Sequence, residues 1–266
     1  MVQAEQRRGL PAQVVHEAIR REGEAELARP ASALAWSALA AGLSMGFSLV
    51  AEGLLRAHLP DAPWRPVIAK LGYSVGFLIV VLGRQQLFTE NTLTVILPLL
   101  TKMDRATLGR IVRLWSIVLG ANLLGALLFA LAIAHTDVFG SATRAVFAQI
   151  GLESIRGGPM TILVRGIFAG WLIALMVWLL PAAEGSKVWV ILVLTYVVGL
   201  GGLAHVIAGS VETLFAAVSG LASPFTWAGW FVPTLIGNVI GGVSLVAALN
   251  HAQVVSGQGE VGRAPD

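Results

Sequence analysis

The chain has 266 residues, of which 56% are hydrophobic and 12% charged, and its mean hydropathy is +0.78. Soluble globular domains carry about 25% charged residues, so this composition excludes a soluble enzyme, a disordered chain and a nucleic-acid-binding protein. The net charge of +3 is scattered between apolar runs, and the absence of cysteine excludes disulfides and thiolate metal sites.

Four uncharged runs are long enough to cross a lipid bilayer, which requires about 20 apolar residues in a helix. They comprise residues 31–51, 114–134, 166–183 and roughly 227–250. Two further segments of membrane length, 71–101 and 188–212, are interrupted by polar and charged residues. The sequence therefore predicts an all-α membrane protein with six transmembrane helices in residues 31–250, of which the second and fifth are broken.

The segments on either side of this pore domain are polar. Residues 1–30 lack the apolar core of a signal peptide and predict a short amphipathic helix. Its apolar side would hold Val14, Val15, Ala18 and Ile19. Residues 251–266 are polar and Gly-rich, which predicts a disordered tail. Most of the 18 Lys and Arg residues fall on the side of the N-terminus, so the positive-inside rule places both termini in the cytoplasm.

Short sequence motifs recur in the two halves of the chain at a spacing of 116 residues. The pairs are Leu87 with Leu203, Thr89 with His205, Asn122 with Asn238, and Gly125 with Gly241. Three spans followed by three more run in opposite directions, so this spacing predicts a 3+3 inverted repeat with a substrate path near the midplane. We expect the paired asparagines and glycines, which lie in the third and sixth helices, to serve helix packing.

Four ionisable residues lie inside the predicted spans and cluster at the two breaks. They are Arg84, Glu90, His205 and Glu212. A charge near the bilayer centre costs at least ~2.5–3.5 kcal/mol on insertion scales, so such residues usually face the protein interior and mark a pathway. His205 would give a proton or a hydrogen bond to a passing anion near physiological pH; the alternative is a structural histidine bonded to a carbonyl.

The other three charges have two interpretations each. Arg84 and Glu90 form either an ion pair that holds the first break or a substrate-attracting charge at a pore mouth. Glu212 either caps the second half-helix, whose first turn favours an acid, or lines the pathway. Leu87 and Phe88, with their apolar neighbours, predict a dry constriction that a bare anion crosses poorly and its neutral conjugate acid far more easily.

The run Leu87-Phe88-Thr89-Glu90-Asn91 resembles the Leu-Phe-Thr-x-Asn signature of the formate/nitrite transporter family. Residues 120–129, 202–209 and 233–242 resemble that family's third, broken fifth and sixth helices, so the resemblance covers roughly residues 32–250. The longer run 84–92 is most similar to the poorly characterised YfdC-like branch of the family.

The resemblance implies an aquaporin-like six-helix protomer that assembles as a homopentamer with one pore in each protomer. It also implies passage of small monovalent anions such as formate or nitrite, either coupled to protons or channel-like. Thr89 and His205 would face each other at the pore centre. The rest of the implied pore wall is Leu87, Phe88 and Phe77 at one constriction, Tyr73 and Val198 near the other, and Ile173.

The chain departs from the family pattern at several positions. Ala204 replaces a glutamate directly before the histidine, and Gly209 replaces an asparagine four residues after it. Gly170 replaces an asparagine of the fourth helix, and Arg84 stands where the pattern has a small acidic or neutral residue. The basic residue that precedes the fourth helix is matched only loosely, by Arg156. The histidine therefore lacks hydrogen-bond partners that the pattern supplies.

These observations favour a channel or transporter for a small weak-acid anion in a bacterial inner membrane. His205 would tune protonation, Thr89 would orient the substrate, and an apolar gate would exclude water. The alternatives are a pore for small neutral solutes and a closed-pore scaffold sealed by an Arg84–Glu90 pair. The sequence lacks the Asn-Pro-Ala pair of aquaporins, which counts against a water pore.

The sequence contains no recognisable nucleophile–base pair, phosphate-binding loop or metal cluster. We therefore expect no enzymatic activity, no cofactor and no metal. The expected partners are the lipid bilayer, the anion and further copies of the chain, with no nucleic acid.

Overall fold

The computed structural model describes residues 10–261, and all regular structure in this range is helical. Five segments are long and apolar enough to cross a membrane: Ala31–His58, Arg65–Leu82, Arg105–His135, Pro159–Ala182 and Pro224–Ser256. A sixth consists of two shorter apolar helices, α11 (Lys187–Leu200) and α12 (Ala208–Val218). The predicted all-α membrane architecture is confirmed.

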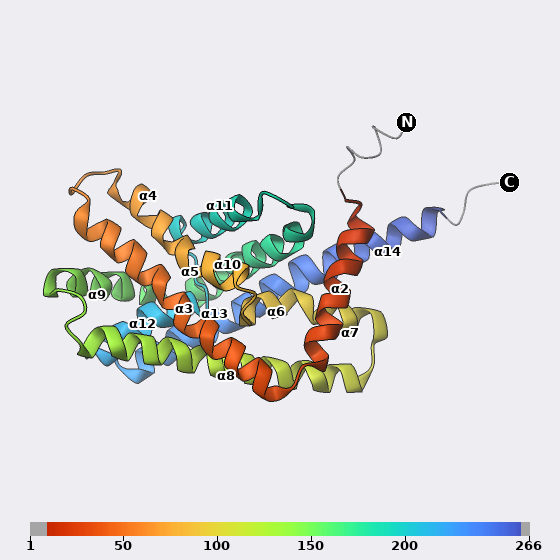
Figure 1. The fold of residues 1–266 in the computed structure, drawn as a ribbon, viewed down its shortest axis with the longest axis horizontal. Coiled ribbons are helices and arrows are strands. Elements are labelled where there is room, and N and C mark those ends of the chain that lie inside the picture. The colour runs from red at the N-terminus through yellow and green to blue at the C-terminus, as the bar shows by residue number, and fades with distance from the viewer. Residues whose placement is uncertain (1–9, 262–266) are drawn as a thin grey trace.

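The long helices associate in two pairs. Helix α3 (Ala31–His58) packs along α8 (Arg105–His135), and α10 (Pro159–Leu179) packs along α13 (Pro224–Ile240) (Figure 1). A π-helical segment, η3 (Gly241–Ala248), continues α13 into the last helix, α14. Between the pairs, α9 (Ser141–Ile155) lies against α12 and α3.

The second and fifth transmembrane segments are broken, as the sequence predicts. The second consists of α4 (Arg65–Ala69), η1 (Lys70–Tyr73) and α5 (Ser74–Leu82), followed after the break by α6 (Phe88–Thr94) and α7 (Ile96–Lys102). The fifth runs through α11 to its break and continues as α12, and η2 (Leu180–Ala182) ends the fourth segment. Both breaks are short, so each half-helix ends close to the start of the next.

The two breaks begin with the same backbone turn. Gly83 and Gly201 end α5 and α11 and donate their N–H groups four residues back, to Ile79 and Val197. The next residue is left-handed in each case, with φ of 51° at Arg84 and 58° at Gly202. These matched turns lie 118 residues apart. The predicted spacing of 116 is therefore wrong at the breaks by two residues, although it holds for Asn122 with Asn238 and for Gly125 with Gly241.

Glycines let the paired long helices approach closely. A Cβ atom on Gly42 or on Gly170 would overlap with the backbone carbonyl of Asn122 or Asn238 respectively. Reciprocally, a Cβ on Gly125 or Gly241 would overlap with the backbone of α3 or α10. The fourth helix has no room for the asparagine expected at position 170, because Asn238 of α13 occupies that space.

The N-terminal helix α2 (Ala12–Ala28) is amphipathic, but its buried face differs from the predicted one. Val15 and Ile19 are buried, whereas Val14 is exposed to 47%. The buried face continues through Gly23 and Leu27, because α2 lies across α6 and α7 and reaches the core. Residues 1–9 lie outside the described part of the chain.

The predicted disordered tail is wrong for residues 251–261. Helix α14 (Leu249–Val261) continues the last transmembrane segment, and its first turn contacts α2, where Nε2 of His16 lies 3.0 Å from Nδ1 of His251. This contact with α2 supports a helix at the start of the polar tail. The composition of the tail does not predict that helix. Both α2 and α14 lie at the same end of the bundle (Figure 1). Residues 262–266 lie outside the described range.

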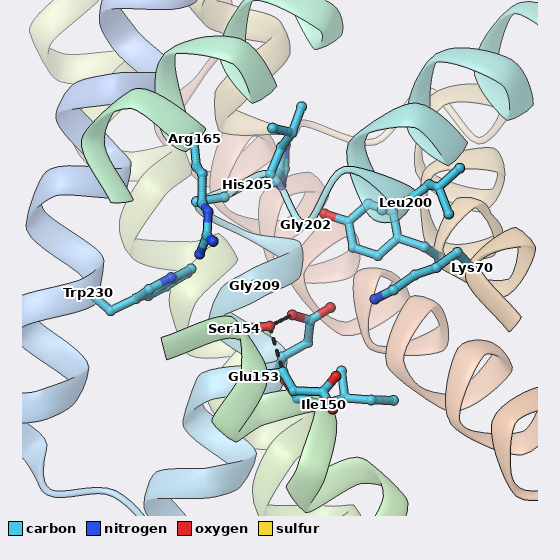
Figure 2. A pocket seen from close by; sticks show the side chains of 15 residues that line it. Lys70, Ile150, Glu153, Ser154, Arg165, Leu200, Gly202, His205, Gly209 and Trp230 are labelled. Carbon is cyan, nitrogen blue, oxygen red and sulfur yellow. Dashed lines mark hydrogen bonds between the residues drawn. The ribbon is translucent and has the colours of Figure 1, made fainter. Parts of the chain in front are cut away.

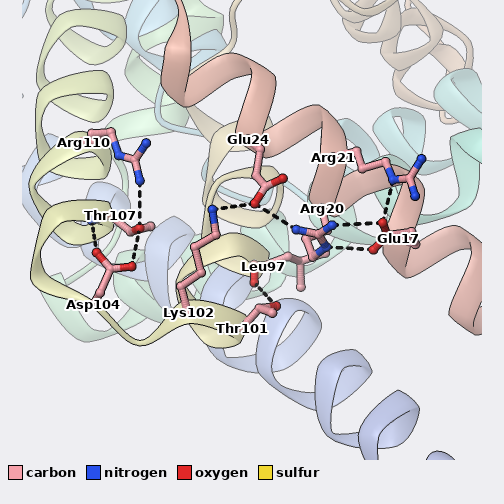
Figure 3. A network of polar contacts seen from close by, with 10 residues as sticks. All are labelled: Glu17, Arg20, Arg21, Glu24, Leu97, Thr101, Lys102, Asp104, Thr107 and Arg110. Carbon is pink, nitrogen blue, oxygen red and sulfur yellow. Dashed lines mark hydrogen bonds and ion pairs between the residues drawn. The ribbon is translucent and has the colours of Figure 1, made fainter.

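Ion pairs fix α2 to the end of the bundle (Figure 3). Glu24 accepts from Lys102 of α7 at 2.7 Å and from Arg20 at 2.9 Å. Hydrogen bonds from Arg20 and Arg21 lower the pKa of Glu17 to about 2, so this carboxylate stays ionised at neutral pH. The network is solvent-accessible, and exposed ion pairs contribute little to the free energy of unfolding. Its main effect is therefore to hold α2 in place.

Substitution of Gly170 by alanine tests the close approach of α10 to α13. We expect Gly170→Ala to destabilise the protein by about 1–3 kcal/mol, because the added methyl group meets backbone that cannot move independently. The free energy of unfolding in detergent measures the effect. Gly229→Ala is the matched control, since a Cβ there meets nothing within 4 Å. Equal stability of the two variants would contradict the packing argument.

Candidate substrate pore

Two buried asparagines satisfy the backbone at the two breaks. Oδ1 of Asn122 accepts from the N–H of Phe88 at 3.0 Å. Its Nδ2 donates to the carbonyl oxygens of Gln86 at 2.9 Å and Ala38 at 2.7 Å. One side chain on α8 thus bonds the backbone on both sides of Leu87 and ties it to α3.

Asn238 makes the same three bonds in the other half. Oδ1 accepts from the N–H of Val206 at 2.8 Å, and Nδ2 donates to the carbonyls of Ala204 at 2.8 Å and Gly166 at 2.9 Å. The residue held between these bonds is His205. The asparagines therefore do more than the helix packing expected of them, and Leu87, rather than Thr89, corresponds to His205.

The structure brings Thr89 and His205 into direct contact. Oγ1 of Thr89 lies 2.7 Å from Nε2 of His205, and both side chains are buried. Nδ1 of His205 lies 3.1 Å from the backbone nitrogen of Ala208 and accepts its hydrogen. The neutral ring therefore carries its hydrogen on Nε2 and donates it to the threonine.

Aromatic and aliphatic side chains surround this polar pair. The ring of Phe77 lies edge-to-face with the imidazole of His205 at a centroid distance of 4.9 Å, and the ring of Tyr73 follows at 5.5 Å from Phe77. The remaining predicted pore residues in the core are also buried: Leu87, Ile173 and Val198. The centre of the site is therefore one hydrogen-bonded polar pair in an apolar shell.

A cavity of about 200 Å³ opens on one side of His205; we call it the Trp230 cavity (Figure 2). Its polar lining comprises Lys70, Tyr73, Glu153, Ser154, Arg165, His205, Glu212 and Trp230. The indole Nε1 of Trp230 is buried and has no hydrogen-bond partner among the described residues. The cavity thus combines cationic, acidic and neutral donor groups beside the histidine.

A second cavity of about 440 Å³ lies under α2; we call it the Glu90 cavity. Its polar lining comprises Glu22, Glu26, Arg84, Gln85, Gln86, Glu90, Thr94 and Lys187. Phe77, Leu87 and Thr89 are fully buried and line neither cavity. Phe77 is four residues from Tyr73 of the Trp230 cavity and four from Val81 of the Glu90 cavity, so these buried side chains separate the two cavities.

The predicted Arg84–Glu90 ion pair is wrong. Nη2 of Arg84 lies 2.7 Å from Oε1 of Glu22 in α2, and the Arg84 side chain is 77% exposed. The Arg84 backbone is left-handed, and its side chain contacts α2 rather than Glu90. Oε1 of Glu90 is buried without a partner among the described residues. The ion pair that would have favoured a sealed scaffold is therefore absent from the described part of the chain.

Two further predicted roles change. Glu212 does not cap α12, because the helix begins at Ala208 and Glu212 lies beyond its first turn; its Oε2 lies 2.5 Å from Oγ of Ser154 on α9. Phe88 packs edge-to-face on Trp115 of α8 at 5.6 Å and lines an apolar groove between α8 and α13. Phe88 therefore belongs to the outer side of the break, and Phe77 and Leu87 fill the centre.

Where the chain departs from the family pattern, other residues occupy the space or supply the charge. A Cβ on Gly209 would approach the indole of Trp230 to 2.6 Å, so the ring occupies the space beside this glycine. Arg165 lines the cavity, and its Nη1 donates to the backbone carbonyl of Arg156 at 2.8 Å. Arg165 is thus a second cation at the cavity besides Lys70. The sequence analysis missed Arg165 because only Arg156 was matched to the pattern.

Among the described residues, no group of three or more His, Asp or Glu side chains could hold a metal ion. The site offers a buried polar pair, flanking cavities and two discontinuous helices held by side-chain amides. In a membrane protein, irregular backbone at depth is tolerated where it is shielded by protein or lines a cavity. These features define a membrane channel or transporter.

The chain belongs to the formate/nitrite transporter family, whose model matches residues 13–252. Its members are channels and transporters, not enzymes. The chain is 43% identical to inner membrane protein YfdC of Escherichia coli over 245 residues, which cover 91% of this chain and 79% of that one. It is 27% identical to the formate channel BtFdhC of Bacillus thuringiensis, with coverages of 77% and 79%.

Two solved structures share the fold. A pentameric formate channel with formate bound superposes with a TM-score of 0.71 at 19% identity, covering 85% of this chain and 98% of that one. An ion channel of the same family superposes with a TM-score of 0.76 at 17% identity, covering 91% and 98%.

Replacement of Asn238 tests its role at the second break. We expect Asn238→Ala to lower the free energy of unfolding by about 2–6 kcal/mol, because it leaves two buried backbone groups at the break, the N–H of Val206 and the carbonyl of Ala204, without their partner. Denaturation in detergent measures the loss. Asn250→Ala is the matched control, because the amide Nδ2 of Asn250 has no partner among the described residues. The role is refuted if both variants unfold alike.

Proposed function

We propose that the protein carries small monovalent weak-acid anions of the formate or nitrite type across the membrane, and that the anion is protonated beside His205. The observation that carries this proposal is the Thr89–His205 hydrogen bond in an apolar shell between two cavities. The names of the formate channels that share the family or the fold support this substrate class.

The apolar shell determines the form in which the solute crosses. An isolated charge in an apolar medium is far more costly than a neutral hydrogen-bonding group. Phe77 and Leu87 offer no compensating charge, whereas Thr89 and His205 offer hydrogen bonds. The conjugate acid therefore passes the buried side chains that separate the cavities, and the anion remains in the flanking cavities.

Each residue of the polar pair has a distinct part in this proposal. The Nε2–H group of His205 donates to the Thr89 hydroxyl, which leaves the hydroxyl hydrogen available for an oxygen atom of the solute. Thr89 thus orients the solute, and His205 orients Thr89. Tyr73 and Val198 line the approach from the Trp230 cavity, and Ile173 completes the wall.

The wider setting follows from the same family membership. We propose a homopentamer in the bacterial inner membrane, since one structural relative is a pentameric channel and the relative YfdC is an inner membrane protein. The positive-inside rule supports cytoplasmic termini. In that orientation the Glu90 cavity, under α2, opens to the cytoplasm, and the Trp230 cavity opens to the opposite side.

Formate uptake into proteoliposomes between about pH 5 and 8 tests the proposal. We expect His205→Ala to reduce the flux about tenfold, because Thr89 loses the hydrogen bond that orients it. His135→Ala is the matched control, since His135 is the exposed last residue of α8. A His205→Ala protein as active as the wild type would remove the proposed role of the pair. Flux of small neutral solutes without formate flux would instead favour the neutral-solute pore.

A further inference from the structure

Glu212 is a buried carboxyl group that none of the roles above uses. It lies on α12 and lines the Trp230 cavity together with His205 and Gly209, three residues before it on the same helix face. Its side chain is 5% exposed. A buried carboxyl beside the histidine requires either a compensating cation or a proton of its own.

The hydrogen bonds of Ser154 indicate a proton on Glu212. Oγ of Ser154 lies 3.1 Å from the carbonyl oxygen of Ile150 and 2.5 Å from Oε2 of Glu212 (Figure 2). A serine hydroxyl has a single hydrogen, whereas both of these neighbours are acceptors when Glu212 is ionised. Both contacts are satisfied if Ser154 donates to the carbonyl and a protonated Glu212 donates to Ser154.

The charged groups around Glu212 are already engaged elsewhere. Nζ of Lys70 lies 2.5 Å from Oε1 of Glu52. Arg56 of α3 makes a double hydrogen bond with Glu153 of α9. Arg165 of α10 donates to a backbone carbonyl.

The other helices beside α12 add no ionisable group that faces Glu212. Helix α8 has none between Arg113 and His135, and α13 has none along its whole length. The polar groups left near Glu212 are the Tyr73 hydroxyl, the Trp230 indole and His205. The carboxyl is therefore held by a neutral serine and not by a cation.

His205 is poorly arranged to supply the proton itself. Its Nδ1 accepts from the Ala208 amide, and its Nε2–H donates to Thr89. A second ring proton would have to displace the backbone bond at Nδ1. Among the neutral groups that line the same cavity, the carboxyl of Glu212 is a far stronger acid than the phenol of Tyr73, the hydroxyl of Ser154 or the indole of Trp230.

We infer that Glu212 is the acid that protonates the substrate anion in the Trp230 cavity before it passes Thr89 and His205. The O–H bond of the Glu212 carboxyl breaks and an O–H bond forms on the anion, which gives the neutral weak acid and a Glu212 carboxylate. Hydronium from the adjoining aqueous phase then returns a proton to Glu212. This inference rests on the proposed function and names the proton donor within it.

The variant Glu212→Gln tests the inference, because its amide still donates to Ser154 and retains the shape of the site. With formate as the probe in proteoliposomes, we expect the flux at about pH 7 to fall about 10²-fold, the lower end of what a positioned acid contributes. The loss should shrink toward about pH 5, because more formate then arrives already protonated. Glu184→Gln is the matched control: Glu184 is exposed between η2 and α11 and lines neither cavity, so we expect the wild-type pH profile.

Infrared difference spectroscopy provides a readout that a purely structural role of Glu212 would not change. We expect the carbonyl stretch of a protonated carboxyl group in the wild type and in Glu184→Gln, and its loss in Glu212→Gln. Wild-type flux in Glu212→Gln at all pH values, or the same carboxyl band in Glu212→Gln as in the wild type, would overturn the inference and leave the proposed function intact. A wild-type protein that carries no formate would overturn both.

Discussion

The fold depends on satisfying the backbone where two transmembrane helices are broken. Hydrocarbon offers no hydrogen bonds, so each free N–H or carbonyl group at a break must find a partner within the protein. Asn122 and Asn238 each bond two such groups, and also a carbonyl of the neighbouring long helix, with one amide. At about 1–3 kcal/mol for each group left unsatisfied, one asparagine accounts for several kcal/mol. Since whole proteins are stable by only about 5–15 kcal/mol, both breaks require these side chains.

The asparagines in turn determine where glycine is needed. Each asparagine amide bonds both a break and the long helix paired with its own. The short side chain can do so because the two paired helices lie almost in backbone contact. Gly42 and Gly170 supply that contact. The absence of an asparagine at position 170 is therefore a packing consequence of Asn238, and Gly209 is likewise matched by the Trp230 ring. Departures from a family pattern here are coupled rearrangements of neighbouring side chains.

The sequence predicted the elements whose signal is local. Apolar runs located the spans, clustered polar residues located the breaks, and the resemblance placed Thr89 opposite His205. Partners set by tertiary packing were not predictable: Arg84, whose backbone is left-handed, pairs with Glu22 of α2, and Glu212 bonds Ser154 on a different helix. The recurring sequence motifs also misaligned the two breaks by two residues, because short apolar motifs match easily by chance. The hydrogen bonds of the asparagines define the correct alignment of the two halves.

That alignment reveals an asymmetry between two otherwise similar halves. The asparagines hold Leu87 at one break and His205 at the other, so matched backbones present an alkyl group on one side and an imidazole on the other. Two imidazoles could share one proton and so place a charge at the centre, and two leucines would leave a solute no hydrogen bond at all. One of each, with Thr89 bonded to the imidazole, gives a single polar contact in a low-dielectric shell. Such a centre stabilises a neutral hydrogen-bonding solute more than a bare ion, which is why the proposed function has protonation precede passage.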